Sequence, residues 1–86
     1  MDERDFIEWY CDDSAFETAV NYYAFGVPVL YAGYLDYGNG KAIFFITQED
    51  PDYEYSCYVV CEGCIMEEGA ANSFDEIADI LASWLN

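Results

Sequence analysis

Hydrophobic residues recur along the chain with two different periods, which divide it into strands and helices. The most regular stretch is Val27–Gln48, where two runs rich in β-branched and aromatic residues flank the polar segment Asp36–Lys41. Such runs favour strands, and the Gly-Asn-Gly in the polar segment supplies the positive φ angles of a tight turn. The stretch therefore predicts a β-hairpin at the core of the fold.

Two further strands are expected after this hairpin. Residues 49–52, Glu-Asp-Pro-Asp, are typical of a turn, and alternation resumes in Tyr53–Cys61. Glu62-Gly63 predicts a tight connection to a fourth short strand, Cys64–Glu67. The small residues at 69–72 predict a loop.

Two short helices are expected before the hairpin. Residues 2–11 have apolar side chains on one side at helical spacing, namely Phe6, Ile7 and Tyr10. The second helix is predicted to be capped by Asp13, or by Ser14 with Glu17 completing a capping box. Its predicted core stripe is Phe16, Ala19, Val20, Tyr23 and Ala24.

The clearest helix is predicted at the end of the chain. Ser73 and Glu76 have the spacing of a capping box. The apolar stripe that follows is Phe74, Ile77, Ala78, Leu81, Trp84 and Leu85. The elements together predict one α+β domain over residues 1–86: two short N-terminal helices, a four-stranded antiparallel β-meander, and a C-terminal helix packed on the sheet.

The net charge of the chain bears on its function. The 86 residues include 18 acids and only two bases, Arg4 and Lys41, for a formal charge of -16. Solubility alone asks for a net charge of roughly 2–8 in magnitude. The aromatic content of 20% argues against a disordered acidic tail. Direct binding of nucleic acid is excluded, because phosphate contacts require lysine and arginine.

Catalytic and cofactor chemistry find little basis in the sequence. The chain has no histidine and no glycine-rich phosphate loop, so we expect no enzyme activity and no cofactor. The spacing of Cys57, Cys61 and Cys64 resembles the cluster ligands of radical SAM enzymes, but 86 residues cannot build their barrel. These three with Cys11 remain an alternative zinc site, against the favoured prediction of reduced thiols in the core.

No apolar run approaches the ~18 residues of a membrane span, and residues 1–5 lack the features of a signal peptide. We therefore expect a cytoplasmic protein, in the cytoplasm of the host cell if a phage encodes it. Both a monomer and a dimer stay open.

The meander topology predicts where the acids gather. The turn between the second and third strands, the end of the fourth strand and the start of the last helix should share one end of the sheet. The residues predicted to bind a partner there are Glu49, Asp50, Asp52, Tyr53, Glu54, Glu67, Glu68, Asp75 and Glu76. A secondary acidic set lies on or after the first helix: Asp5, Glu8, Asp12 and Asp13.

Size, charge and aromatic content together resemble a class of small acidic phage or plasmid proteins that imitate nucleic acid, the anti-CRISPR and antirestriction proteins. The segment Val29–Lys41 looks like the strand-turn opening of ArdA-type antirestriction proteins. The resemblance implies a stoichiometric inhibitor that occupies a basic nucleic-acid-binding site. The alternatives are a toxin-immunity or antitoxin protein against a basic nuclease, and a non-catalytic dimeric accessory domain whose acids only keep it soluble.

Overall fold

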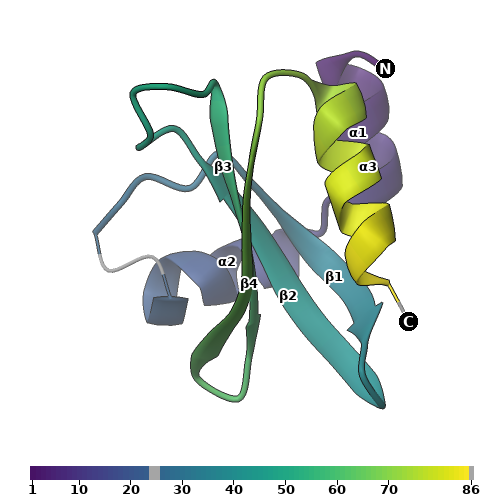
Figure 1. The fold of residues 1–86 in the computed structure, drawn as a ribbon. Coiled ribbons are helices and arrows are strands. Elements are labelled where there is room, and N and C mark those ends of the chain that lie inside the picture. The colour runs from purple at the N-terminus through teal and green to yellow at the C-terminus, as the bar shows by residue number, and fades with distance from the viewer. Residues whose placement is uncertain (24–25, 86) are drawn as a thin grey trace.

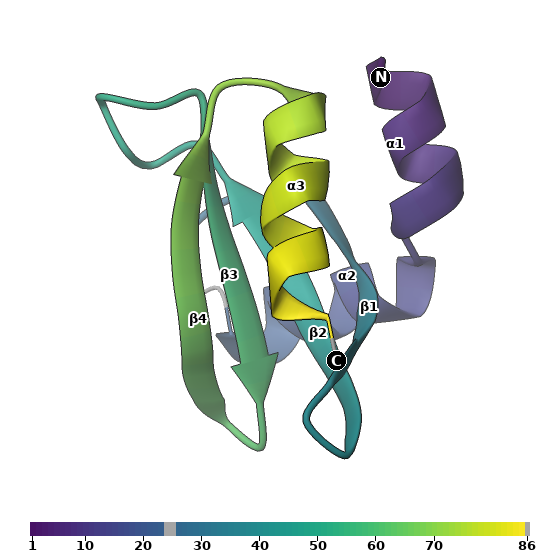
Figure 2. The same cartoon turned by 45° about the vertical axis from the view of Figure 1, so that its right-hand side comes forward.

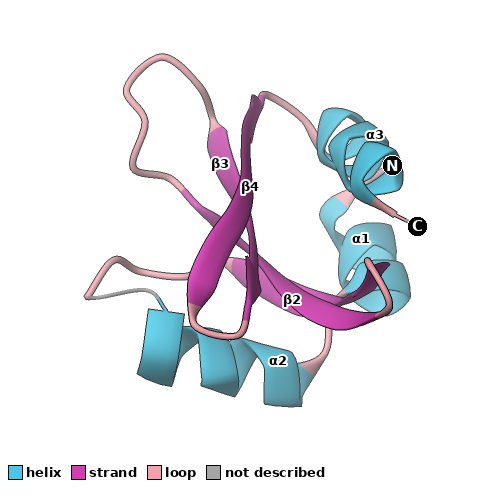
Figure 3. Cartoon of the chain, turned by 60° about the horizontal axis from the view of Figure 1, so that its bottom comes forward, coloured by secondary structure: helices cyan, strands magenta, loops and turns pink. Residues whose placement is uncertain are grey.

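A four-stranded antiparallel sheet carries helices on both of its faces (Figure 1). The computed structural model describes residues 1–23 and 26–85. Helices α1 (Glu3–Tyr10) and α3 (Phe74–Trp84) cover one face (Figure 2). Helix α2 (Asp13–Thr18), which continues as the π-helical turn η1 (Ala19–Tyr23), covers the other (Figure 3). The predicted α+β class and element order are confirmed.

The strands follow one another in the sheet in chain order, as the meander prediction requires. They are β1 (Tyr31–Tyr37), β2 (Gly40–Thr47), β3 (Tyr55–Cys61) and β4 (Cys64–Ala71). Two-residue turns join the first pair and the last pair. Glu62 and Gly63 both have positive φ, 51° and 82°, which is the requirement of a type I′ hairpin turn.

The fourth strand is longer than the sequence indicated. It continues beyond Glu67 to Ala71, so the loop predicted at residues 69–72 is wrong for its first three residues. A Cβ on Gly69 would lie 3.4 Å from the side chains of both Ile80 and Trp84. The small residues therefore mark the place where α3 packs closely on the strand, and not a loop.

Alternate residues of the strands contribute to two separate cores. The larger core lies under α1 and α3 and is centred on Phe6, Phe44, Ile46, Val59 and Ile77. The smaller lies under α2 and contains Ala15, Ala19, Ala32, Phe45 and Val60. The predicted alternation along β3 is confirmed, since Val59 and Val60 belong to different cores.

The second helix starts earlier than predicted. Asp12 is its N-cap, and Asp12 Oδ1 accepts hydrogen bonds from the backbone N–H of Ser14 at 2.9 Å and of Ala15 at 3.3 Å. The predicted caps at Asp13 and at Ser14 are therefore wrong. Asp12 N also donates to Ala32 O at 3.0 Å, which ties the start of α2 to β1 and fixes which residues face the sheet.

The predicted core stripe of the second helix is confirmed at Ala19 and Tyr23, which pack in the smaller core, but is wrong at Phe16 and Val20. Ala15 and Ala19 are fully buried, whereas Phe16 and Val20 are 38% and 46% exposed. In α1, Phe6 is buried but Ile7 is 46% exposed. Small alanines let α2 approach the sheet, and the larger apolar side chains are left outside. Ala24 of the predicted stripe lies outside the described residues.

The predicted cap of the last helix is confirmed. Ser73 Oγ accepts from Glu76 N at 3.2 Å, and Glu76 Oε2 accepts from Asn72 N at 3.1 Å. The buried stripe holds except at Leu85, which is 51% exposed beyond the end of α3. Within the described ranges, none of the helices has the length and hydropathy needed to cross a bilayer.

Candidate functional site: the acidic end of the sheet

Three segments distant in sequence meet at one end of the sheet, which we call the acidic end. They are the β2–β3 loop (residues 48–54), the β4–α3 connection with the start of α3 (residues 72–76), and the start of α1 (residues 1–5), all at the top of Figure 2. Glu54 N donates to Asn72 Oδ1 at 3.0 Å, which joins the first two segments. The Met1 amine lies 3.0 Å from Asp75 Oδ1, which joins α1 to α3.

Most of the predicted partner-binding residues belong to this end. Five are in the β2–β3 loop and two are in the first turn of α3: Glu49, Asp50, Asp52, Tyr53, Glu54, Asp75 and Glu76. The four loop acids are exposed or half-buried, and Tyr53 is 46% exposed. The meander argument therefore places these seven residues correctly in space.

Glu67 and Glu68 are not at this end, contrary to prediction. Because β4 runs on to Ala71, Glu67 lies about 13 Å back along the strand at ~3.3 Å per residue. The Tyr37 hydroxyl, near the opposite end of the sheet, donates to Glu67 Oε2 at 3.3 Å. Glu68 pairs in register with Tyr58, mid-strand. The misplaced end of β4 is the cause of both errors.

The start of α1 is the part of the acidic end that the sequence did not indicate. Asp2 caps α1, and Glu3 accepts a hydrogen bond from the Tyr31 hydroxyl. The hydrogen bond to Asp75 raises the pKa of the Met1 amine, with smaller contributions from Asp2 and Asp5. The acids at the start of α1 were visible in the sequence, but nothing there indicated that α1 and α3 begin side by side.

Neutral donors, not cations, hold Glu49, Asp50 and Glu54 of the β2–β3 loop in place. Asp50 Oδ1 accepts from Asp52 N at 2.8 Å, and Glu54 Oε1 accepts from Gln48 Nε2 at 3.2 Å. Glu49 accepts from the Tyr58 hydroxyl. The ion pairs found in the described part of the chain, Met1–Asp75 and Lys41–Asp36, involve none of these acids. The loop is therefore fixed in shape while it keeps its negative charge.

The pKa of Tyr58 reflects its burial and the acids around it. Burial, followed by the hydrogen bond to Glu49 and the charges of Glu49 and Glu68, raises the pKa of Tyr58 to about 12. Exposed carboxylates can accept charge-assisted hydrogen bonds from the N–H groups of lysine and arginine.

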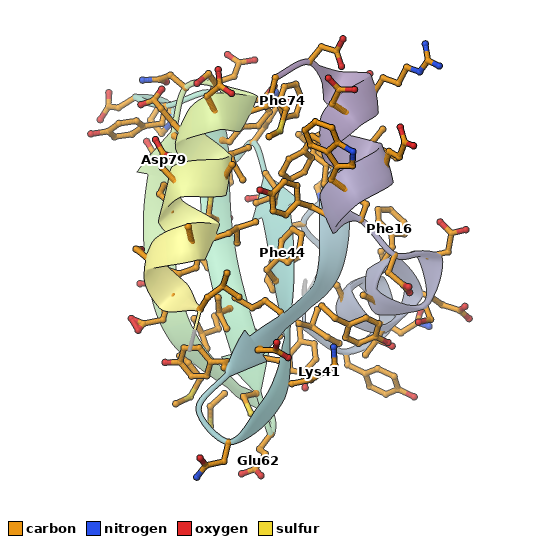
Figure 4. All side chains as sticks on the ribbon, turned by 90° about the vertical axis from the view of Figure 1, so that its right-hand side faces the viewer. Phe16, Lys41, Phe44, Glu62, Phe74 and Asp79 are labelled. Atoms are coloured by element: carbon orange, nitrogen blue, oxygen red, sulfur yellow. The ribbon has the colours of Figure 1, made fainter. Side chains whose placement is uncertain are left out.

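Comparison with protein-family models, with curated proteins and with solved structures finds no match. The acids of this end are mostly exposed. A hollow of about 810 Å³ lies elsewhere, against the β1–β2 turn, and is lined by tyrosine and glycine residues together with Lys41 and Glu62. Figure 4 shows both side chains below Phe44 in that view, far from Phe74 at the start of α3.

The secondary acidic set does not form one continuous row. Helix α1 ends at Tyr10, so Asp12 and Asp13 belong to the next helix. Asp5 lies in the first turn of α1 and belongs to the acidic end, and Glu8 is exposed further along that helix. Hydrogen bonds from Ser14 and Ala15 lower the pKa of Asp12, which acts as a helix cap.

The cysteines are all free thiols in different surroundings. Cys57 is fully buried, Cys11 and Cys61 are half-buried, and Cys64 is exposed. Among the described residues, no three cysteine, aspartate or glutamate side chains come close enough to hold a metal ion, so the zinc alternative gains no support. Burial raises the pKa of Cys57 to about 12 and that of Cys11 to about 11.

A thiol-reactive dye should separate these cysteines. At pH 8 we expect Cys64 to react rapidly and Cys57 only after unfolding, because a thiol must be exposed and ionised to react. A Cys64→Ser variant should lose the fast phase. Rapid labelling of Cys57 in the folded Cys64→Ser protein, identified by peptide mapping, would contradict the buried environment.

The same pKa shift predicts how stability depends on pH. The Cys57 thiol ionises near pH 9 when unfolded and at about 12 when folded, so the folded state holds its proton longer. The free energy of unfolding should therefore fall as pH rises through this window. Urea titrations should measure this fall relative to the free energy of unfolding at pH 8. The fall should be smaller for the Cys57→Ala variant than for the unchanged protein.

Proposed function

We propose that the chain is a stoichiometric protein inhibitor of the anti-CRISPR kind, which imitates nucleic acid and occupies the basic nucleic-acid-binding site of a defence nuclease. The observation that supports this most directly is the composition of the acidic end. Its segments 48–54 and 72–76 contain six acids and no lysine or arginine. Nearby cations are confined to the start of α1, where the Met1 amine is paired with Asp75 and Arg4 is exposed.

The mechanism is steric and electrostatic. The summed negative field attracts a basic surface over long range and speeds the encounter. On contact, the fixed carboxylates accept hydrogen bonds from side chains that otherwise hold phosphates. Acids spaced as Asp75 and Asp79 are on α3 lie ~5–6 Å apart, which is comparable with the spacing of phosphates along a strand. Tyr53, which is 46% exposed, is placed to stack on an arginine.

The proposal is tested by titrating the protein into purified CRISPR effector–guide complexes and measuring cleavage of target DNA. Cleavage by the susceptible effector should reach background at an equimolar ratio, and double-stranded target DNA should compete with the protein for binding. Raising salt from about 0.1 M to about 1 M shortens the screening length from ~10 Å to ~3 Å, so affinity should fall steeply.

Two outcomes would contradict this mechanism. One is simultaneous binding of the protein and DNA to the effector, since both are expected to occupy the same site. The other is the absence of inhibition for every effector in the panel. An uncharged crowding agent and an unrelated acidic protein at the same concentration serve as controls for non-specific effects of crowding and charge.

A further inference from the structure

A small apolar groove lies between α1 and α2, beside the edge strand β1. Ile7, Phe16 and Leu30 contribute its apolar lining, and Asp12 and Asp13 lie at the junction of the two helices. Its volume is about 150 Å³. An apolar cavity of that size is large enough for a benzene ring, and hence for one apolar side chain. We call it the α1–α2 groove.

The groove is lined by large apolar side chains that the sequence pattern predicts to be buried but that the helices leave partly exposed. Ile7 and Phe16 fall on the predicted core stripes, yet they are 46% and 38% exposed. Their neighbours Phe6 and Ala15 are fully buried in their place. Figure 4 shows Phe16 on the outer side of its helix, beside the lower end of α1. Two large apolar side chains therefore border an open hollow.

The charge around the groove limits what can occupy it. Asp12 and Asp13 line it, Glu8 and Glu17 are exposed on the same two helices, and residues 5–40 contain no lysine or arginine. A second copy of this chain would bring another charge of -16 against this surface. A segment with lysine or arginine around an apolar residue is complementary to it in both respects.

The backbone geometry selects the way in which such a segment binds. Asp12 N already donates to Ala32 O at 3.0 Å, so this part of the β1 edge is not free to pair with an added strand. The groove therefore offers a pocket for a side chain, with carboxylates near its opening, and it does not extend the sheet at that point.

We propose that the α1–α2 groove takes an apolar side chain from a basic segment of the partner protein. The inference rests on the proposed function, since it supplies a second contact to the same kind of basic partner. The acidic end attracts any cationic surface. The groove adds a requirement for an apolar residue within the basic segment, so it selects among basic partners.

The test uses two synthetic peptides and the full chain labelled with ¹⁵N. One peptide is an amphipathic helix of leucine and lysine; in the other, serine replaces every leucine, so that the charge is the same. The leucine peptide should shift the amide signals of residues 7, 11, 16 and 30–32 and bind at least about tenfold more tightly than the serine peptide.

Matched variants distinguish binding in the groove from non-specific hydrophobic binding. Ile7→Ser with Phe16→Ser should weaken binding of the leucine peptide about tenfold, to the level of the serine peptide. Ile65→Ser with Met66→Ser changes two residues on β4 that are each 48% exposed, and should leave binding unchanged. Phe16→Ala alone is a milder second variant, and the dispersion of the amide signals shows whether each variant is folded.

The results also distinguish this inference from the proposed function. Equal affinity for the two peptides, with shifts confined to residues 48–54, would overturn the groove and leave the acidic end untouched. Shifts at the groove that grow with protein concentration alone would identify a second copy as the occupant and would equally overturn it. Shifts at the groove that persist when the loop acids are changed to amides support it independently of inhibition.

Discussion

Changing the four acids of the β2–β3 loop to amides is expected to abolish inhibition and to leave the fold intact or more stable. The variant is E49Q/D50N/D52N/E54Q. An exposed ion pair contributes up to about 1 kcal/mol, so losing four of them weakens binding by up to about 4 kcal/mol, or several hundredfold. Within the chain Glu49, Asp50 and Glu54 accept hydrogen bonds from neutral donors, so the variant leaves no buried cation unpaired. Reduced self-repulsion should raise the free energy of unfolding.

A control with the same change in charge shows whether position matters. E17Q/D36N/E62Q/E68Q removes four exposed acids that lie outside the acidic end. The affinity of this control for the partner should fall far less than that of the loop variant, when both are measured at the same salt concentration. Equal loss in the two variants would show that net charge alone drives binding. Unchanged inhibition by a folded loop variant would exclude the acidic end as the binding surface.

The strands could be predicted because their residues follow the period of the sheet and their turns have characteristic chemistry. Gly38 and Gly63 both adopt positive φ, as hairpin turns require. The end of β4 could not be predicted in the same way. Gly69 and its neighbours are small because α3 lies over them, and a contact between distant segments leaves the same composition as a loop.

The second helix shows a related limit. Its periodicity was correct, but several stripes one residue apart fit the same period. The hydrogen bond from Asp12 to Ala32 on β1 sets the start of α2, and that contact joins residues 20 apart in sequence. Burial then falls on Ala15 and not on Phe16. Hydrophobicity alone predicts the opposite choice.

The acidic end was predictable to the extent that it follows from local topology. A meander brings the β2–β3 loop and the start of α3 together, and Ser73 with Glu76 marks where α3 begins. The contribution of α1 depends on how one helix packs beside another. The contacts that decide it, such as Phe6 with Phe74 at 5.2 Å between ring centroids, join opposite ends of the chain.

Replacing Gly33 by alanine is expected to be strongly destabilising. A Cβ there would lie 1.9 Å from the Tyr10 carbonyl oxygen and 2.6 Å from Phe44 Cε2. The first contact is with backbone, so α1 must move away from β1 to relieve it. Overpacking of this kind costs typically 1–3 kcal/mol and more where backbone must shift, so we expect about 3 kcal/mol or more. Thermal unfolding should occur at least about 12 °C lower, at ~4 °C or more per kcal/mol.

Alanine substitutions at two other glycines distinguish the effect of this clash from the general effect of adding a methyl group to a strand. Gly40 in β2 has no atom within 4 Å of the position of a Cβ, and Gly69 in β4 has only contacts of 3.4–3.5 Å. Gly40→Ala should therefore be nearly neutral, and Gly69→Ala should lie between it and Gly33→Ala. If Gly40→Ala lost as much stability as Gly33→Ala, the clash with Tyr10 could not be the cause of the destabilisation. Because α1 carries Asp2 and Glu3, its displacement in any Gly33→Ala protein that still folds should also weaken partner binding, while Gly40→Ala should bind normally.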